Sequence, residues 1–185
     1  MNNLADRITA ALRILIGQPI SNCWRAADMH IFEFGPRRQT TNHKGEPIEV
    51  SDLRLHVQCR WRFVDADRIL FGRDDLLYPA DTSIPHDEFD WGQQESVADV
   101  LRRRWFDQHG EAAPVVTSVQ GERYGGFRIE LSSGFALETF PCDSRRGEHS
   151  EHWRLIINDS PDSNHFVVCG YGIEGVDEQV HDDED

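Results

Sequence analysis

The chain has 185 residues, of which 38% are hydrophobic and 28% are charged, and its formal net charge is −14 at pH 7. This length suits one domain that buries about 70% of the surface of its unfolded chain, so a core can form without a metal or a disulfide. The charge disfavours binding to nucleic acids and anionic membranes, and no apolar run has the about 18 residues that a membrane span needs. Because no secretory signal is found and the four cysteines are scattered, we expect a cytoplasmic protein with free thiols.

The N-terminal quarter of the chain predicts a helix, a strand and a loop. Apolar side chains repeat at helical spacing over residues 3–16, and a glycine and a proline follow. Residues 20–34 predict one long strand, and residues 35–47, rich in Pro, Arg, Thr, Asn and Gly, predict a polar loop. One face of the strand would carry Trp24, Phe32 and Phe34, and the other Met29 and Ile31.

The most regular pattern is the alternation of apolar and polar residues over positions 53–63, which is typical of a half-buried strand. On the apolar side we expect Trp61 to pack in the core beside Cys59 and Phe63. Residues 69–71 are predicted to return beside this strand as a hairpin partner. The opposite face would carry a line of basic side chains, here called the basic row, made by Arg54, His56, Arg60 and Arg62.

The later chain predicts a second helix and several strands. Residues 72–92 show no period and form a long connection, which is typical of a functional or a loose segment. A helix is predicted near 94–109, with Ser96 and Asp99 as a capping box. A meander follows, with strands at Val115–Val119, Phe127–Leu131, Phe135–Phe140, Trp153–Ile157 and Phe166–Tyr171.

These elements predict an α+β fold with a single domain over residues 1–176. Its mostly antiparallel β-sheet would be flanked by the N-terminal helix and by the second helix near 94–109. Residues 177–185 form an acidic tail that we expect to be disordered. The sequence leaves open the oligomeric state and the role of residues 72–92.

Acidic residues are concentrated in the later chain. Residues 1–60 carry eight basic and six acidic side chains, whereas residues 61–185 carry eleven basic and 27 acidic ones. Such a surface would attract a basic protein partner, although an acidic excess also serves simply to keep a protein soluble. The candidate partner-binding residues lie in the tail and are Asp177, Glu178, Asp182 and Asp183.

The basic row is the candidate ligand site. Planar guanidinium groups bind carboxylates and phosphates through two parallel hydrogen bonds. Among the three arginines, His56 would have a lowered pKa and be neutral near pH 7, which suits a general base. The alternative is that carboxylates on other strands neutralise the row internally, and the candidates are Asp28, Glu130 and Glu138.

Metal ligation and thiol chemistry have few candidates in this sequence. His149 and His152 flank a glutamate, but the tight Cys and His spacing of zinc sites is absent, so we expect no metal. Cys142 is followed by Arg145 and Arg146, which would lower the pKa of its thiol, although an exposed loop cysteine is the simpler interpretation. No nucleophile-elbow, zinc-protease, phosphate-loop or dinucleotide motif occurs, so no catalytic residue or cofactor is predicted.

Three segments, LHVQCRWR (55–62), GFALETFP (134–141) and EHWRL (151–155), are together similar to a group of small, uncharacterised bacterial proteins. The second and third also resemble strands of some toxin-immunity proteins. This resemblance implies a related fold and transfers no catalytic residue. Our first hypothesis is a non-enzymatic interaction protein, of immunity or antitoxin type, that binds a basic protein partner through an acidic surface. The second is a small-ligand binder or enzyme with an anion site on the basic row.

Overall fold

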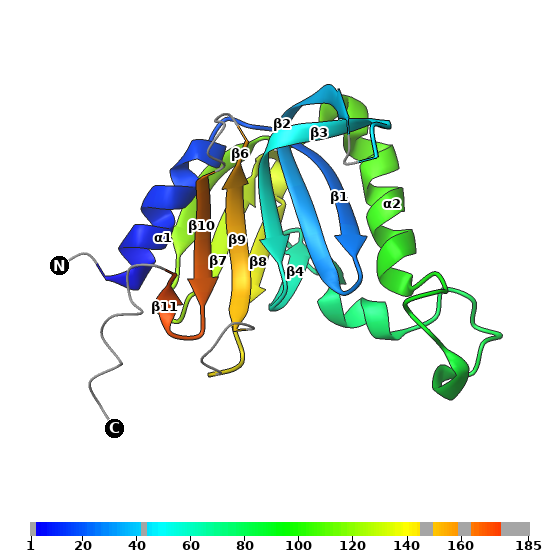
Figure 1. Cartoon of the computed structure of the whole chain (residues 1–185). Coiled ribbons are helices and arrows are strands. Elements are labelled where there is room, and N and C mark those ends of the chain that lie inside the picture. Colours follow the sequence, from blue (N-terminus) through cyan, green and yellow to red (C-terminus); the bar gives the residue numbers. More distant parts are fainter. Residues whose placement is uncertain (1–2, 42–43, 145–149, 159–163, 175–185) are drawn as a thin grey trace.

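The protein is a sandwich of two antiparallel sheets with one helix at each open side (Figure 1). The structure is a computed structural model and describes residues 3–41, 44–144, 150–158 and 164–174. One hydrophobic cluster joins the inward-facing side chains of both sheets and both helices. The predicted α+β class, antiparallel pairing and flanking helices are confirmed, and the strands are divided between two sheets where the sequence suggested one.

The six-stranded sheet has the order β1-β2-β3-β9-β10-β11. Its strands are β1 (Ile20–Ala26), β2 (Met29–Thr41), β3 (Pro47–Val57), β9 (Glu151–Ile157), β10 (Asn164–Cys169) and β11 (Gly172–Ile173). The five-stranded sheet has the order β5-β4-β8-β7-β6. Its strands are β4 (Arg60–Val64), β5 (Ile69–Gly72), β6 (Val116–Gly121), β7 (Phe127–Leu131) and β8 (Ala136–Phe140).

The helices close the two open sides of the sandwich. α1 (Leu4–Leu12) packs against β6, and α2 (Val97–His109) packs against β1 and β5. At Gly121 in β6 the approach of α1 is so close that a Cβ atom would lie 2.4 Å from the carbonyl oxygen of Ala5, so only glycine fits there. Short 3₁₀ turns are found at Arg13–Leu15, Arg73–Leu77, His86–Glu88, Gly110–Ala112 and Ser132–Gly134.

The segment predicted as one strand over 20–34 is a hairpin. The chain reverses between β1 and β2 at Ala27, which adopts a left-handed φ of 54° although it is not a glycine. Because the chain reverses, inward and outward side chains no longer alternate as in one continuous strand. Trp24 pairs with Ile31 on the outer face, whereas Phe32 lies in the core. The predicted loop over 35–47 is also wrong, because β2 and β3 extend into it and stay paired to the Thr41–Pro47 rung.

The alternating segment 53–63 crosses from one sheet to the other. β3 ends at Val57 and β4 begins at Arg60, and the amide groups of Gln58 and Cys59 both donate to the carbonyl oxygen of His152, at 2.9 and 3.0 Å. Because the crossing takes two residues, the alternation keeps its phase and the apolar side chains face the shared core in both sheets. Trp61 is buried as predicted, with 3% of its surface exposed, and β5 is the predicted hairpin partner of β4.

Removing the Trp61 ring tests this packing. Its ring centroid lies 4.6 Å from that of His30 and 5.0 Å from that of Phe32, so Trp61→Ala leaves a cavity and should cost about 3 to 5 kcal/mol of unfolding free energy. Arg60→Ala, on the exposed side of the same strand, should cost less than about 1 kcal/mol. Urea unfolding of the two variants gives the comparison, and similar losses for both would contradict the orientation of β4.

The buried His30 should make stability depend on pH. Burial, followed by the positive charge of Arg102, lowers the pKa of His30 from 6.5 to about 4, so the folded protein keeps it neutral where the unfolded chain protonates it. Stability is therefore lost as the pH falls from 6.5 towards 4, and the loss from this group amounts to about 3 kcal/mol. Urea unfolding at pH 7 and pH 4 should show a smaller decrease for His30→Gln than for the wild type. Equal decreases would rule out this role.

Candidate functional site

The basic row predicted from the sequence is divided between the two faces of the sandwich. Arg54 and His56 lie in β3, on the outer face of the six-stranded sheet, whereas Arg60 and Arg62 lie in β4, on the outer face of the five-stranded sheet. The prediction of one shared face is therefore wrong, because the chain changes sheets between the two pairs. No small ligand can contact all four side chains.

The half of the row on β4 is neutralised internally. Arg62 forms an ion pair with Glu138 on the neighbouring β8 and lies over the ring of Phe140, 4.7 Å from its centroid. Arg60 is 3.6 Å from a carboxylate oxygen of Asp74. Of the other carboxylates considered in the sequence, Glu130 pairs with Arg128 and Asp28 with Arg73, so neither neutralises the row.

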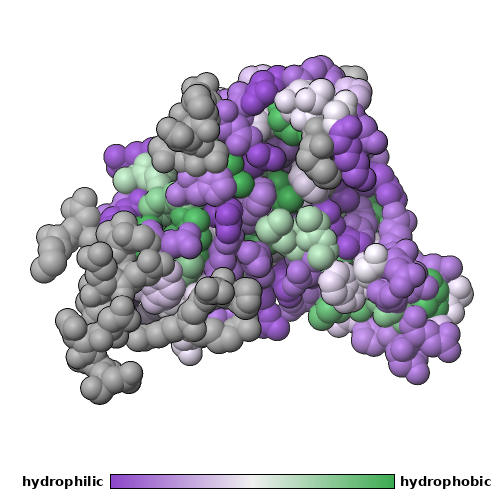
Figure 2. Space-filling model, in the orientation of Figure 1, coloured by the Kyte–Doolittle hydropathy of each residue, from purple (hydrophilic) through white to green (hydrophobic). Residues whose placement is uncertain are grey.

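Residues 74–95 form an acidic projection between β5 and α2, which we call the acidic arm. It stands out from the sandwich at the lower right of Figure 1, and in Figure 2 it is mostly hydrophilic with hydrophobic groups among the polar ones. The sequence of the arm contains no lysine or arginine, a signal that the net charge of the whole later chain does not reveal. Its carboxylates belong to Asp74, Asp75, Asp81, Asp87, Glu88, Asp90 and Glu95.

Local hydrogen bonds give the acidic arm a defined path although it has little regular structure. The Asp81 carboxylate accepts from the amide of Ser83 at 2.9 Å, and that of Asp90 accepts from the amide of Gly92 at 2.8 Å. Asp87 and Glu88 differ from these residues, because both are exposed and neither side chain has a hydrogen bond or ion pair to a described residue. Their charges are therefore available to a partner.

Exposed apolar side chains accompany the carboxylates of the acidic arm. Leu77 is 48% exposed and Tyr78 is 54% exposed, and the Tyr78 ring lies 5.7 Å from the ring of His86. Protein interfaces commonly combine such anchors with surrounding polar groups. The arm thus offers both charge and apolar contact area on one projection.

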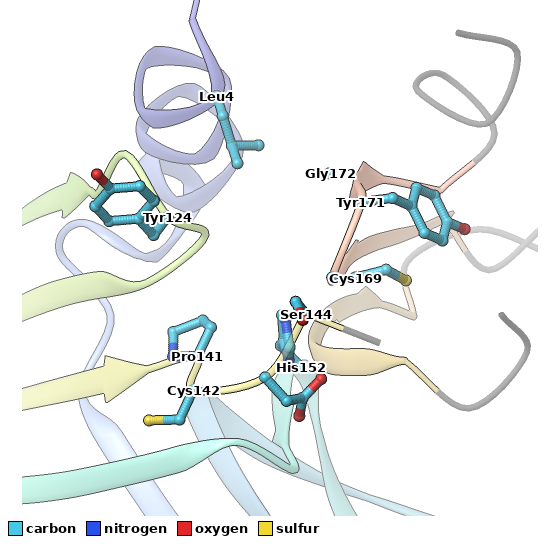
Figure 3. A pocket seen from close by; sticks show the side chains of 11 residues that line it. Leu4, Tyr124, Pro141, Cys142, Ser144, His152, Cys169, Tyr171 and Gly172 are labelled. Atoms are coloured by element: carbon cyan, nitrogen blue, oxygen red, sulfur yellow. The ribbon is translucent and has the colours of Figure 1, made fainter. Parts of the chain in front are cut away.

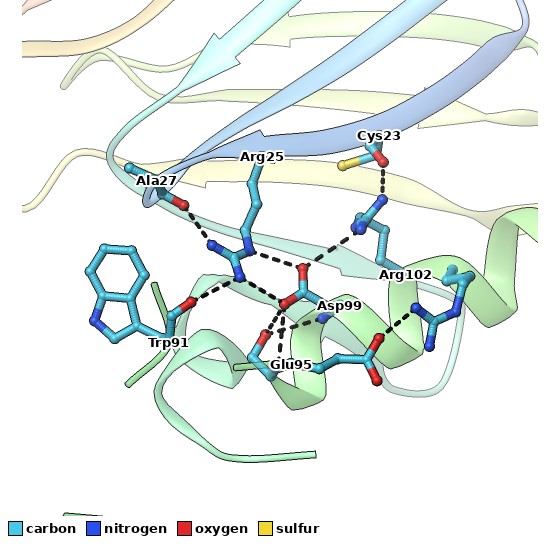
Figure 4. Close-up of polar contacts among 9 residues, drawn as sticks. Cys23, Arg25, Ala27, Trp91, Glu95, Asp99 and Arg102 are labelled. Atoms are coloured by element: carbon cyan, nitrogen blue, oxygen red, sulfur yellow. Dashed lines mark hydrogen bonds and ion pairs between the residues drawn. The ribbon is translucent and has the colours of Figure 1, made fainter. Parts of the chain in front are cut away.

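The base of the acidic arm is fixed by the polar network around Arg25 and Asp99 (Figure 4). The guanidinium of Arg25 donates to both carboxylate oxygens of Asp99, at 2.9 and 3.0 Å, and to the carbonyl oxygen of Trp91 at 2.9 Å. Asp99 also completes the predicted capping box by accepting from the Ser96 backbone amide at 3.2 Å, and it accepts from the Ser96 hydroxyl at 2.8 Å. This network joins β1, the arm and the beginning of α2. The capping box was predictable, but its connection to Arg25 was not.

Asp99 stays ionised in this network. Burial favours its neutral form, but the hydrogen bonds from Arg25 and Ser96 outweigh burial and hold the pKa of Asp99 well below its usual range. Arg102 lies 3.6 Å from the same carboxylate and donates to the carbonyl oxygen of Cys23 in β1. The network therefore combines opposite charges with directional bonds, and this combination gives a defined position to the base of the arm.

Cys142 lies in a hollow of about 710 Å³ at the end of the sandwich near α1. His152, Cys169 and Tyr171 also line it, and the two cysteine sulfurs point in different directions (Figure 3). The Cys142 thiol donates to the carbonyl oxygen of Phe140 at 2.9 Å, and burial raises the pKa of the Cys169 thiol. A raised pKa disfavours the reactive thiolate of Cys169.

Several sequence-predicted residues lie outside the described residues, and the structure says nothing of them. They are His149, Arg145, Arg146 and the tail residues Asp177, Glu178, Asp182 and Asp183. Where the structure does describe the chain, no group of three or more His, Cys, Asp or Glu side chains could hold a metal ion. The described helices are too short and too polar to span a membrane.

The Arg25–Asp99 pair should stabilise the arm measurably. Its partners are only 17% and 11% exposed, so Arg25→Ala takes two charged hydrogen bonds from a largely buried carboxylate, to which Arg102 and Ser96 remain close, and should cost about 3 kcal/mol of unfolding free energy. The amides of Ala80 and Val97, which bond across the base of the arm, should also exchange hydrogen faster. Arg38→Ala, which breaks an exposed pair with Asp52 on the six-stranded sheet, is the control and should change neither quantity appreciably. Unchanged exchange in Arg25→Ala would show that the arm is held by other contacts.

Comparison with known proteins gives no match for this chain. No protein-family model, no curated protein and no solved structure is similar to it. The function must therefore be inferred from the geometry and charge of the protein itself.

Proposed function

We propose that this protein is a non-enzymatic interaction protein that binds a basic protein partner through the acidic arm. The observation that carries the proposal is that one segment combines exposed Asp87 and Glu88, whose side chains have no partner among the described residues, with exposed Leu77 and Tyr78. Charge attracts and orients a basic partner over a distance of about 8 to 10 Å in physiological salt, and the apolar groups are buried once contact is made.

The fixed position of the acidic arm supports this proposal. A flexible acidic segment loses conformational freedom when it binds, and this loss reduces the affinity. Here the bonds from Arg25 to Asp99 and to Trp91 hold the arm before any partner arrives. The predicted contribution of the tail residues remains part of the proposal, as a second acidic surface for the same partner.

The finer parts of the proposal concern the type of partner and the cellular location. We propose an immunity or antitoxin type of role, in which the partner is a basic toxin, on the strength of the resemblance of residues 134–141 and 151–155. We also propose a cytoplasmic location. All four cysteines are free thiols, which is the usual state in that reducing compartment.

Charge removal at the tip of the acidic arm tests the proposal. Proteins captured from the native host with the wild-type chain are purified singly, and their association is measured by surface plasmon resonance at low and high salt. Asp87→Asn with Glu88→Gln should slow association with the true partner about tenfold at low salt, because electrostatic steering is lost. The wild-type association rate should itself fall steeply with added salt.

The matched control removes the same charge elsewhere. Asp67 and Glu122 are exposed acidic residues outside the arm, so Asp67→Asn with Glu122→Gln should leave the association rate within about twofold of the wild type. Equal slowing by both double variants would mean that only total charge matters. That outcome, or binding that does not respond to salt, would overturn the arm as the interface.

A further inference from the structure

Two basic side chains of the divided row meet two others on the outer face of the six-stranded sheet. In β3, Arg54 and His56 point to the same side because they are two residues apart. In the register of the sheet Arg54 pairs with Ile156 and His56 with Arg154, while His165 in β10 pairs with the same Ile156. We call Arg54, His56, Arg154 and His165 the outer-face basic cluster.

The outer-face basic cluster surrounds an apolar floor. Ile156 is only 5% exposed although it lies on an outer face. Arg54 and His165 flank it on the two neighbouring strands, and Arg154 lies on its own strand two residues away. Figure 2 shows this side of the molecule, where hydrophilic groups lie among hydrophobic ones over the middle strands.

Arg54 carries a positive charge that no described carboxylate neutralises. Its side chain forms no ion pair or hydrogen bond with the described residues, and its Nε atom is buried without a partner among them. The acidic residue opposite it in the sheet, Glu33, bonds instead to Asn22 at 3.2 Å and to Trp24 at 3.4 Å. Both arginines of the β4 half of the row have a carboxylate partner, whereas the guanidinium of Arg54 has none within the part of the chain that the structure describes.

His56 provides a second unpartnered polar group beside Arg54. Its Nε2 atom is buried and has no hydrogen-bond partner among the described residues. Burial lowers the pKa of His56 to about 4, with further lowering by Arg54 and Arg154, so the imidazole is neutral at pH 7. The sequence predicted this direction from like charge alone, but burial is the larger cause. A buried polar atom without a partner is costly, and a bound ligand that supplies the missing bond removes that cost.

We propose that the outer-face basic cluster binds a small oxyanion, a carboxylate or a phosphate group, above Ile156. The guanidinium of Arg54 binds it in bidentate fashion, and His56 supplies a further hydrogen bond. Arg154 reaches the same area: it is paired with Glu151 through Nε at 2.7 Å, and its Nη1 atom lies 3.3 Å from Nδ1 of His165. The pair with Glu151 leaves Arg154 in a supporting role, and Arg54 carries the uncompensated charge.

Binding of an anion should respond to pH through His56. The bound negative charge favours the imidazolium and raises the pKa of His56, so affinity increases as the pH falls. The charged or titratable groups that face His56 from its own and adjacent strands are Asp52, Arg54, Glu33, Glu151, Arg154 and His165. The carboxylate of Asp52 is paired with Arg38. The carboxylate of Glu33 accepts hydrogen bonds from Asn22 and Trp24 and lies near Arg37.

Calorimetric titration tests the site with two probes, inorganic phosphate and succinate, at pH 7. We expect saturable binding at one site, weakened about tenfold or more by Arg54→Gln and less by Arg54→Lys, which keeps the charge without the bidentate geometry. Arg60→Gln makes the same charge change on the other face and should stay within about twofold of the wild type. Thermal unfolding without ligand establishes that each variant is folded.

The outcomes separate the possible ligands. Binding of phosphate alone assigns a phosphoryl ligand, and binding of succinate, alone or with phosphate, assigns a carboxylate ligand. Equal losses in Arg54→Gln and Arg60→Gln would mean nonspecific attraction and overturn the site, as would the failure of both probes to bind saturably. With sulfate, whose charge is constant between pH 5 and 7.5, the wild type should bind more tightly at the lower pH, and His56→Gln should lose most of that difference. Equal affinity at the two pH values in the wild type would overturn the role of His56.

Discussion

The two-residue crossing at Gln58 and Cys59 decides how the two halves of this protein relate to each other. Both amides donate to the carbonyl oxygen of His152, so the chain leaves one sheet and enters the other at a point fixed by a third strand. The even length of the crossing keeps the apolar side chains of β3 and β4 in one core. Because the alternation is kept, the basic side chains of β3 lie on the outer face of the six-stranded sheet and those of β4 on the outer face of the five-stranded sheet.

Much of the fold follows from the sequence because local patterns report local structure. The capping box of Ser96 and Asp99, the hairpin of β4 and β5, and the burial of Trp61 were all predictable from spacing. Alternation has no signal for a change of sheet, however, because a strand that continues and a strand that crosses with even length give the same pattern. The β1–β2 hairpin was missed for a related reason. Its turn uses Ala27 in a left-handed conformation that glycine or asparagine usually marks.

The Arg25–Asp99 network and the outer-face basic cluster were less predictable because each one joins distant parts of the chain. Arg25 meets Asp99 across 74 positions, and His56 meets Arg154 only because β9 pairs with β3. The sequence pattern identified Arg54 and His56 as candidate ligand-binding residues, but it grouped them with Arg60 and Arg62, which lie on the other sheet. The sequence showed that the later chain is acidic, and the candidate partner-binding residues were placed in the tail. A dense run of carboxylates lies instead in the connection over residues 72–92, where the hydrophobic pattern has no period.

The placement of the two helices also bears on how the sheets meet other chains. Sheets expose unpaired backbone groups along their terminal strands, and these edges are where foreign strands add and where aggregation begins. In the part of the chain that the structure describes, β1, β5 and β6 each lie against a helix, and the remaining terminal strand, β11, spans only Gly172–Ile173. Because β11 pairs only with Val168 and Cys169, the first part of β10 is the edge that the described sandwich leaves for strand addition, whereas helices lie along the other three terminal strands.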